Sequence, residues 1–278
     1  MTPDAATGLV VLLGDPVGHS LSPALHNAAF EAQGLNLTYL ACRVSATDLG
    51  AAVEGLGALG AVGANVTIPH KRAVLGLAQS ASAAARATGA ANTLVRADGG
   101  WHADNTDVEG FLAPLGDRER FRDETAVVLG AGGAARAVAW ACAARLGSRV
   151  VVAARRRAQA AALADALGSG VEARSLEELG DAGREAALVV NATPVGMAPH
   201  ADATPWAFGP GVRRDQIVYD LVYRPSPTRF LREADALGLE TIGGLPMLIG
   251  QAAASYRLWT GREMPLGPVR SALDSTPP

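Results

Sequence analysis

Short apolar runs alternate with Ala- and Leu-rich segments of helical spacing along the first third of the chain. This alternation favours βαβ units with parallel strands. Ser22 followed by Pro23 is a helix-start signal, so we expect the Ser22 hydroxyl to cap a helix. Pro69 is expected to open a further helix that carries Lys71. The other elements predicted here are strands at Leu9–Leu13, Thr38–Val44 and Ala61–Val66, a helix at Asp48–Leu56, and a hairpin of Thr93–Ala97 and Trp101–Ala103.

The middle of the chain repeats this pattern with near-continuously apolar strands, which is typical of buried parallel strands. A last helix, at about Met247–Trp259, has no place in the middle sheet, so we expect it to pack on the first domain. The tail after Pro265 carries several prolines and is expected to fray. The strands of the middle region are predicted at Ala126–Leu129, Arg149–Ala153, Leu188–Asn191 and Ile217–Asp220, and its helices at Ala134–Leu146, Ala158–Leu167 and Thr228–Leu237.

Composition narrows the class of protein. The chain has 278 residues, of which 49% are hydrophobic and 18% charged, as in a globular protein. A net charge of −3 provides no basic field for nucleic acid or an anionic membrane. The absence of a long apolar run or a secretion signal predicts a soluble cytoplasmic protein. Cys42 and Cys142 lie far apart and the five histidines form no ligand pattern, so no metal site is expected.

A glycine-rich turn directly follows the predicted strand Ala126–Leu129 and opens a helix. Its residues Gly130, Ala131, Gly132, Gly133 and Ala134, with Ala135 in the third position, match the Gly-x-Gly-x-x-Gly/Ala fingerprint of dinucleotide sites. The first glycine permits the tight turn, and the second lets the backbone approach a pyrophosphate at the start of the helix.

The end of the next strand indicates which dinucleotide binds. An NAD site usually places an acid there for the ribose hydroxyl, whereas this chain has Arg155 and Arg156 and no acid before Asp165. The alternative is a solvated basic helix start, but cations at a helix N-terminus oppose its dipole unless an anion compensates. We therefore expect NADP, with both guanidinium groups near the 2′-phosphate.

The elements and the glycine turn together predict an α/β protein of two domains. Residues 1–106 plus 247–278 would form the substrate-binding and catalytic domain, and residues 107–246 a Rossmann-type NADP-binding domain. The chain would cross between them at Asp107–Leu115 and at the last helix. Two domains joined by two passages leave an interdomain cleft, where small-molecule sites usually form.

Only one of the 24 basic residues is a lysine, Lys71. A guanidinium cannot release a proton in a protein, whereas an ammonium can be tuned to do so, which makes Lys71 a candidate proton donor. In a chain poor in lysine, a single stray lysine is the alternative interpretation.

Small polar residues gather where predicted strands of the first domain end. Ser20 and Ser22 stand two apart, a spacing that directs both hydroxyls of an extended chain to one side, towards a carboxylate. Asn65 and Thr67 follow the third strand, Asn92 lies in the segment Gly89–Thr93, and Asp107 lies in the segment Asp104–Asp107. Helix capping by Ser22 or Asp107 and a turn role for Asn92 are the structural alternatives. The set suits a small polyhydroxylated carboxylate, and a nearby nicotinamide would make the chemistry hydride transfer.

The motifs in their order resemble the shikimate/quinate dehydrogenase family along essentially the whole chain. They are Ser-x-Ser-Pro-x-x-His-Asn from Ser20 to Asn27, Asn-Val-Thr-Ile-Pro-His-Lys from Asn65 to Lys71, Gly-Ala-Ala-Asn-Thr from Gly89, Asn-Thr-Asp ending at Asp107, the glycine turn from Gly130, Asn-Ala-Thr-Pro-Val-Gly-Met from Asn191, and Gly-Leu-Pro-Met-Leu from Gly244 leading to Gln251.

The resemblance implies a reversible NADPH-dependent reduction of 3-dehydroshikimate to shikimate, in aromatic amino-acid biosynthesis. It implies that Lys71 and Asp107 are the catalytic pair and that Ser20 and Ser22 hold the substrate carboxylate. The further contacts that it implies are Asn65, Thr67, Asn92, Tyr223 and Gln251 on the substrate, and Thr193, Leu221, Gly244 and Met247 along the cofactor. We also expect the protein to bind a small-molecule substrate and neither nucleic acid nor a membrane. It would be a monomer or a homodimer.

One motif departs from the family. Ala154-Arg155-Arg156 stands where the family usually has Asn-Arg-Thr, so an amide and a hydroxyl are replaced and a guanidinium is added. Two other functions stay open: a quinate/shikimate dehydrogenase with relaxed substrate or NAD use, and a non-catalytic NADP-binding sensor. The presence of both Lys71 and Asp107 argues against the sensor, which would not need them.

Overall fold

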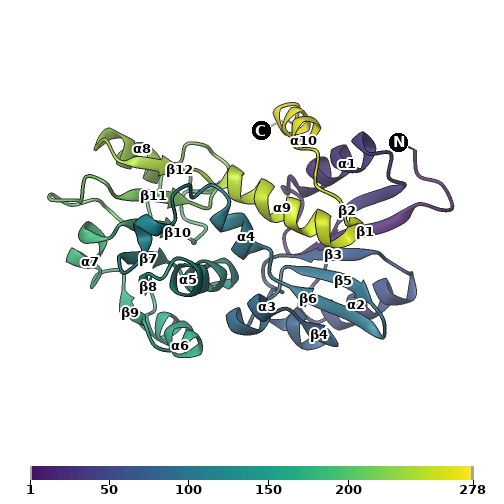
Figure 1. Cartoon of the computed structure of the whole chain (residues 1–278), viewed down its shortest axis with the longest axis horizontal. Helices are drawn as coiled ribbons and strands as arrows, with labels where there is room; N and C mark the ends of the chain where they lie inside the picture. The colour runs from purple at the N-terminus through teal and green to yellow at the C-terminus, as the bar shows by residue number, and fades with distance from the viewer. Residues whose placement is uncertain (1, 277–278) are drawn as a thin grey trace. The chain divides into compact units, whose positions relative to one another are not determined.

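The computed structural model describes residues 2–276 and divides into two compact α/β units (Figure 1). Within the described residues, unit 1 contains the chain up to Thr106 and from Gln251 onward, and unit 2 is Asp107–Gly250. The second boundary between the units lies between Gly250 and Gln251, inside helix α9 (Gly244–Thr260). The sequence predicts this boundary earlier, between residues 246 and 247. The first half of α9 belongs to unit 2 because Gly250 approaches α4 closely: a Cβ on Gly250 would lie 3.0 Å from the Cα of Gly110.

Unit 1 is built on a mixed six-stranded sheet. Its first three strands are parallel, as predicted. The predicted hairpin is confirmed: its two strands are antiparallel and turn at Asp98-Gly99, where Gly99 has a φ of +82° that favours glycine. In spatial order the strands are β2 (Leu37–Arg43), β1 (Gly8–Gly14), β3 (Gly63–Val66), β5 (Thr93–Ala97), β6 (Gly100–Asp104) and β4 (Ser80–Ala81).

The helices of unit 1 correct two predictions. They are α1 (Ser22–Ala32), α2 (Leu49–Ala58), the 3₁₀ helix η1 (Ala73–Leu77), α3 (Ala83–Thr88) and α10 (Leu266–Asp274). Ser22 is the first residue of α1 rather than its cap, and no side chain caps that helix. Lys71 lies in a turn before η1, not in a helix, because its carbonyl accepts a 2.7 Å hydrogen bond from the Ala91 N–H instead of continuing a helical ladder.

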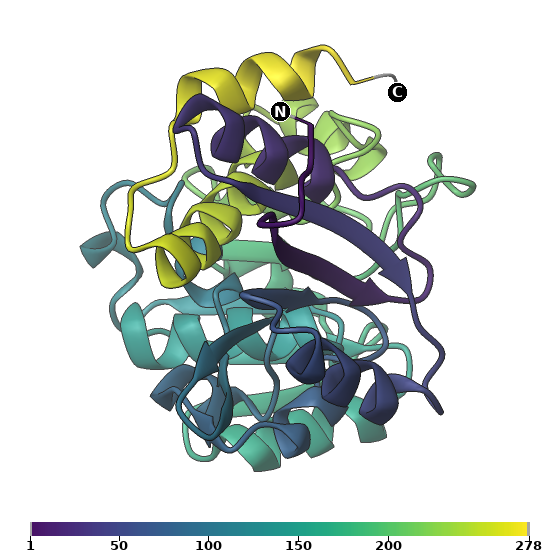
Figure 2. The ribbon, with the colours of Figure 1, turned by 90° about the vertical axis from the view of Figure 1, so that its right-hand side faces the viewer.

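The predicted fraying of the tail is also wrong for most of its length. Residues 266–274 form α10, which packs on α1 (Figure 2), and Val269 and Leu273 are buried. Their spacing of four residues puts both side chains on one helix face, so the apolar stripe outweighs the prolines. Pro277 and Pro278 lie outside the described residues.

Unit 2 is built on a fully parallel sheet of the doubly wound type. In spatial order its strands are β12 (Glu240–Ile242), β11 (Ile217–Asp220), β10 (Leu188–Asn191), β7 (Thr125–Leu129), β8 (Arg149–Ala154) and β9 (Val171–Ser175). The four predicted strands are confirmed as the central four, and β9 and β12 add an edge on either side. The Rossmann-type prediction is confirmed by this order, which reverses direction between β7 and β10.

The helices of unit 2 are α4 (Asp107–Leu112), the 3₁₀ helix η2 (Glu119–Phe121), α5 (Gly133–Arg145), α6 (Arg157–Leu167), α7 (Gly180–Glu185) and α8 (Arg229–Ala236). Apolar residues of β7, β8, β10 and β11 form one core with Phe230 and Leu231 of α8. Because ligands of such sheets bind beyond the carboxyl ends of the strands, the reversal point between β7 and β10 identifies where a site is expected.

Candidate active site

The glycine turn between β7 and α5 has the geometry that its sequence predicts. Gly130 has a φ of +115°, and a Cβ there would lie 3.0 Å from the Ala192 carbonyl oxygen. Gly132 precedes α5 without a side-chain cap, and a Cβ on it would meet open space. The backbone N–H groups at the start of α5 are therefore approachable by an anion, which fits the pyrophosphate of a dinucleotide.

Three other predicted cofactor residues lie on segments that follow the neighbouring strands. The Thr193 hydroxyl donates to Asn191 Oδ1 at 2.6 Å, at the end of β10, and the Leu221 N–H donates to the Asn191 carbonyl at 3.0 Å. Gly244 packs against the carbonyl group of Leu221, where no side chain would fit. The structure thus gathers Thr193, Leu221 and Gly244 at the carboxyl ends of β10 and β11, beside the glycine turn. Met247 is buried in the first turn of α9.

The arginines that follow β8 differ in their surroundings. Arg157 forms an exposed ion pair with Glu178, with an N···O distance of 3.5 Å. Arg155 and Arg156 are exposed, and within residues 2–276 neither guanidinium group forms a hydrogen bond or an ion pair. Both are therefore open to an anionic ligand, as the predicted 2′-phosphate contact requires.

In unit 1 the two predicted carboxylate-binding serines are linked to each other. The Ser20 hydroxyl accepts a 3.2 Å hydrogen bond from the Ser22 N–H, which is the local structural role that the sequence did not reveal. Because Ser20 Oγ acts as the acceptor in that bond, its proton stays available for donation. Ser20 is half-buried and Ser22 is buried.

The turn that carries Lys71 is anchored on both sides. The buried His70 ring donates from Nε2 to the Val44 carbonyl at 2.7 Å, and Thr67 donates its N–H to the Leu13 carbonyl at 2.9 Å. With the Lys71 carbonyl bonded to Ala91, the backbone of this residue is held between β1, β2 and the segment before Asn92. The partly buried side chain of Lys71 therefore starts from a defined position.

Asn65 and Asn92 lie in one buried hydrogen-bond network. Asn65 Oδ1 accepts from the Tyr39 hydroxyl at 2.8 Å, and its amide nitrogen donates to Thr93 and Ser255 at 3.1 and 3.0 Å. Asn92 Oδ1 accepts from the Thr106 N–H at 2.8 Å. These bonds fix the orientation of both amides.

Ser255 of α9 is a member of this network that sequence analysis missed. Its buried hydroxyl lies 2.9 Å from Thr93 Oγ1 and 3.0 Å from Thr106 Oγ1, and it donates to the Gln251 carbonyl. A polar residue four positions after Gln251, on the same helix face, is the signal that could have found it. Gln251 itself is half-buried and its Oε1 lies 3.5 Å from Asn92 Nδ2.

The remaining predicted residues belong to unit 2. Asp107 is buried at the first position of α4, directly after Thr106, and is 4% exposed. Tyr223 is half-buried after β11, where burial raises the pKa of its hydroxyl and Arg224 partly opposes that shift.

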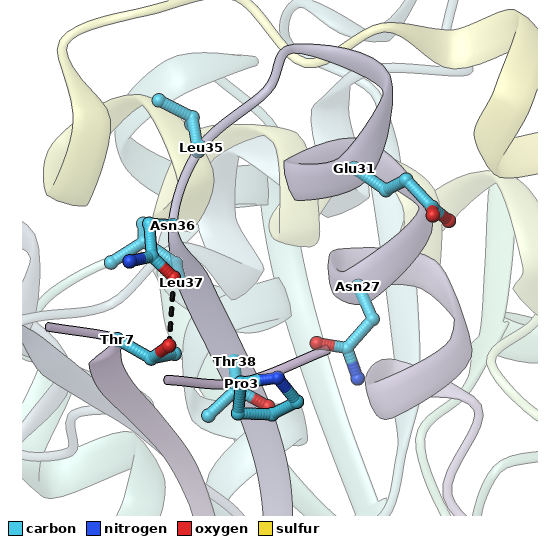
Figure 3. Close-up of a pocket in the computed structure, with 8 residues that line it drawn as sticks. All are labelled: Pro3, Thr7, Asn27, Glu31, Leu35, Asn36, Leu37 and Thr38. Carbon is cyan, nitrogen blue, oxygen red and sulfur yellow. Dashed lines mark hydrogen bonds between the residues drawn. The ribbon is translucent and has the colours of Figure 1, made fainter. Parts of the chain in front are cut away.

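A cavity of about 300 Å³ in unit 1 lies elsewhere, among the N-terminal segment, α1 and β2 (Figure 3). None of the predicted site residues lines it. Asn27, on its wall, donates to the Tyr39 carbonyl and accepts from the Tyr39 N–H, so it occupies part of the free edge of β2. Because none of the predicted site residues lines it, this cavity is no part of the candidate site.

Comparisons with known proteins relate the whole chain to one family. Family models described as the shikimate dehydrogenase substrate-binding domain, the shikimate/quinate 5-dehydrogenase and the shikimate 5′-dehydrogenase C-terminal domain match residues 12–94, 116–198 and 244–273. The shikimate dehydrogenase (NADP(+)) of Salinibacter ruber is 50% identical over 279 residues, covering 97% of this chain and 98% of that protein. The chain belongs to the shikimate dehydrogenase family.

Solved structures of the family share the fold. A crystal structure of shikimate dehydrogenase with NADP⁺ matches with a TM-score of 0.91 and 37% identity, covering 100% of this chain and 98% of that one. The enzyme from Thermus thermophilus, in complex with NADP(H) and shikimate, matches with a TM-score of 0.85 and 39% identity, covering 96% and 99%. A quinate dehydrogenase from Corynebacterium glutamicum in complex with NAD matches with a TM-score of 0.86 and 34% identity. The match covers 97% of this chain and 99% of that one.

Proposed function

We propose that this chain catalyses the reversible NADP-dependent reduction of 3-dehydroshikimate to shikimate, a step of aromatic amino-acid biosynthesis. The observation that carries the proposal is the 50% identity to a shikimate dehydrogenase (NADP(+)) along nearly the whole chain. The approachable N–H groups of the glycine turn, with Arg155 and Arg156 open beyond β8, support NADP as the cofactor.

The cytoplasmic location and the monomeric or homodimeric state stay predictions from the sequence. Within residues 2–276 every helix is too short or too polar to cross a lipid bilayer.

Substrate binding would use groups whose hydrogen-bonding state the structure defines. Ser20 keeps its hydroxyl proton for the substrate carboxylate, and Ser22 would be the second donor. Asn65 Oδ1 has one lone pair left beside its bond to Tyr39, so it would accept from a ring hydroxyl. The other proposed contacts are Thr67, Asn92, Tyr223 and Gln251.

The reduction builds negative charge on the carbonyl oxygen of the substrate. When bound, NADPH supplies the hydride. Lys71 would stabilise the charge on the oxygen as an ammonium, or also deliver the proton to it, and Asp107 would hold that amine in place and keep it charged. Ala131, Gly133 and Ala134 of the glycine turn, with Thr193, Leu221, Gly244 and Met247, would line the cofactor.

Steady-state rates with shikimate and quinate, each with NADP and with NAD, test the function. We expect the highest kcat/KM for shikimate with NADP. A higher kcat/KM for quinate with NAD would favour the alternative that the C. glutamicum relative suggests. Tight NADPH binding without turnover of either substrate would indicate a sensor.

Replacing both Arg155 and Arg156 by alanine should lower the ratio of NADP to NAD efficiency by about 10–100-fold, since charge-assisted hydrogen bonds contribute roughly 1.5–3 kcal/mol. The matched control is Arg157→Ala, because that arginine is paired with Glu178. Values of kcat/KM for both dinucleotides measure the ratio. An unchanged ratio in the double variant, or an equal fall in the control, would assign cofactor preference to other residues.

A further inference from the structure

Unit 2 buries a carboxylate that the proposed chemistry does not use. Asp220 ends β11 and is 0% exposed. Within the described part of the chain, no arginine, lysine or histidine forms an ion pair with it. It accepts three hydrogen bonds instead, from Thr228 Oγ1 at 2.6 Å, Asn191 Nδ2 at 2.8 Å and the Val222 N–H at 3.0 Å. Burial raises the pKa of this carboxyl to about 6, so the site disfavours the charge that it holds.

The hydrogen bond from Asn191 connects Asp220 to Thr193, one of the proposed cofactor residues. Both ends of the Asn191 amide are engaged: its nitrogen donates to Asp220 and to the Val195 carbonyl, and its oxygen accepts from the N–H and the hydroxyl of Thr193. The Thr193 hydroxyl in turn accepts from the Val195 N–H at 3.2 Å. The turn after β10 is therefore organised around one amide, and Asp220 is one of the groups that fix its orientation.

That turn forms one wall of the space beside the glycine turn. A Cβ on Gly130 would lie 3.0 Å from the Ala192 carbonyl oxygen and 3.1 Å from Thr193 Cγ2, so the two turns are in close contact. The carbonyl of Asn191 also accepts from the Leu221 N–H. The Asp220–Asn191 pair thus joins the ends of β10 and β11, one strand away from the reversal between β7 and β10.

We infer that Asp220 is a positioning residue of the cofactor site: by orienting the Asn191 amide, its carboxylate holds the Ala192–Thr193 turn against Gly130. The inference rests on the proposed placement of NADP at this turn. It adds a residue that touches no ligand and acts through Asn191.

The second partner of Asp220 provides a matched control. Thr228 caps α8, since its hydroxyl also accepts from the Leu231 N–H at 3.3 Å. Thr228→Val removes that cap and one donor to the carboxylate but leaves the bond to Asn191. Losing the Thr228 bond or the Asn191 bond would each lower the local stability around Asp220. Only loss of the Asn191 bond would also release the Ala192–Thr193 turn.

The test is a fluorescence titration of the full-length protein with NADPH, together with KM for shikimate at saturating NADP. Asp220→Ser keeps a hydroxyl for the Val222 N–H but is too short to hold Asn191 as well, and we expect the Kd for NADPH to rise about tenfold or more with little change in that KM. Asp220→Asn keeps an oxygen for Asn191 and should restore most of the affinity. Thr228→Val should lower the unfolding temperature and leave the Kd unchanged.

Two results would overturn the inference: an unchanged Kd in Asp220→Ser, or an equal rise in Kd in Thr228→Val. If Asp220→Ser does not fold, Asn191→Ser breaks the same bond from the other side, and retained affinity in that variant would refute the inference equally. A wild-type protein that binds no NADPH would contradict the proposed cofactor site itself, which is a different outcome from unchanged affinity in the variants.

Discussion

Replacing Lys71 by alanine is expected to lower kcat by roughly 10²–10⁴-fold while KM for shikimate changes little, because in the proposed mechanism the ammonium acts on charge that develops only in the transition state. Lys71→Arg should fail nearly as badly, although it keeps the charge. A guanidinium is planar and larger than an ammonium, and it does not release a proton. Steady-state kinetics of both variants with shikimate and NADP measure the effect.

Arg72→Ala is the matched control, because Arg72 is an exposed cation beside Lys71 in the same turn. Its kcat should stay close to that of the unaltered protein. An equal loss in this control would mean that the turn, rather than the amine, had been disturbed. Near-normal turnover in Lys71→Arg would show that positive charge alone suffices.

Acid should destabilise unit 1 through His26, whose ring is 0% exposed and whose two nitrogens have no hydrogen-bond partner within the described residues. The ring stacks on Tyr39 with centroids 4.5 Å apart and lies 5.2 Å from Trp259. Burial among these rings lowers the pKa of His26 from 6.5 to about 3.

The sign follows from proton uptake. Below pH 6.5 the unfolded chain binds a proton at His26 that the folded chain does not. The free energy of unfolding therefore decreases as the pH is lowered from 6.5 to about 3. At 1.36 kcal/mol per unit, His26 should cost about 2 kcal/mol of unfolding free energy between pH 7 and pH 5. Urea unfolding at the two pH values, followed by tryptophan fluorescence, measures this difference.

His26→Phe should abolish about 2 kcal/mol of the pH dependence whatever it does to stability at pH 7. Asp220 acts in the opposite sense, because its raised pKa makes protonation favour the folded state as pH falls through about 6. It is present in both proteins and therefore cancels from the comparison. The exposed His200 offers His200→Phe as the matched substitution, which controls for the exchange of a histidine for a phenylalanine. The same slope in His26→Phe as in the unaltered protein would contradict the prediction.

Unit 2 was the more predictable half because its local signals agree with its tertiary structure. β10 and β11 begin and end at the predicted residues, since strands buried on both faces appear in the sequence as uninterrupted apolar runs. The glycine turn was recognisable for a similar reason: the φ of +115° at Gly130 and its contact with Ala192 exclude a side chain there.

Unit 1 departed from prediction where distant segments compete for backbone groups. The Lys71 carbonyl bonds to Ala91, far along the chain, and no helix signal around Pro69 contains that partner. The tail forms α10 because α1 lies beside it, which its proline content could not reveal.

Most of the strands and helices, the glycine-rich turn and the side chains that we propose for the chemistry could be predicted from the sequence, because these predictions depend on residue type and short spacing. The orientation of those side chains depends on contacts that form only in the folded chain. Some of these contacts join residues that are far apart in the sequence. They are the hydrogen bonds of Ser255 with Thr93 and Thr106, the bond between Asp220 and Asn191, and the packing of His26 against aromatic rings. Burial and hydrogen bonding between such segments arise only when the sheets assemble, so no local pattern encodes which partner each side chain takes.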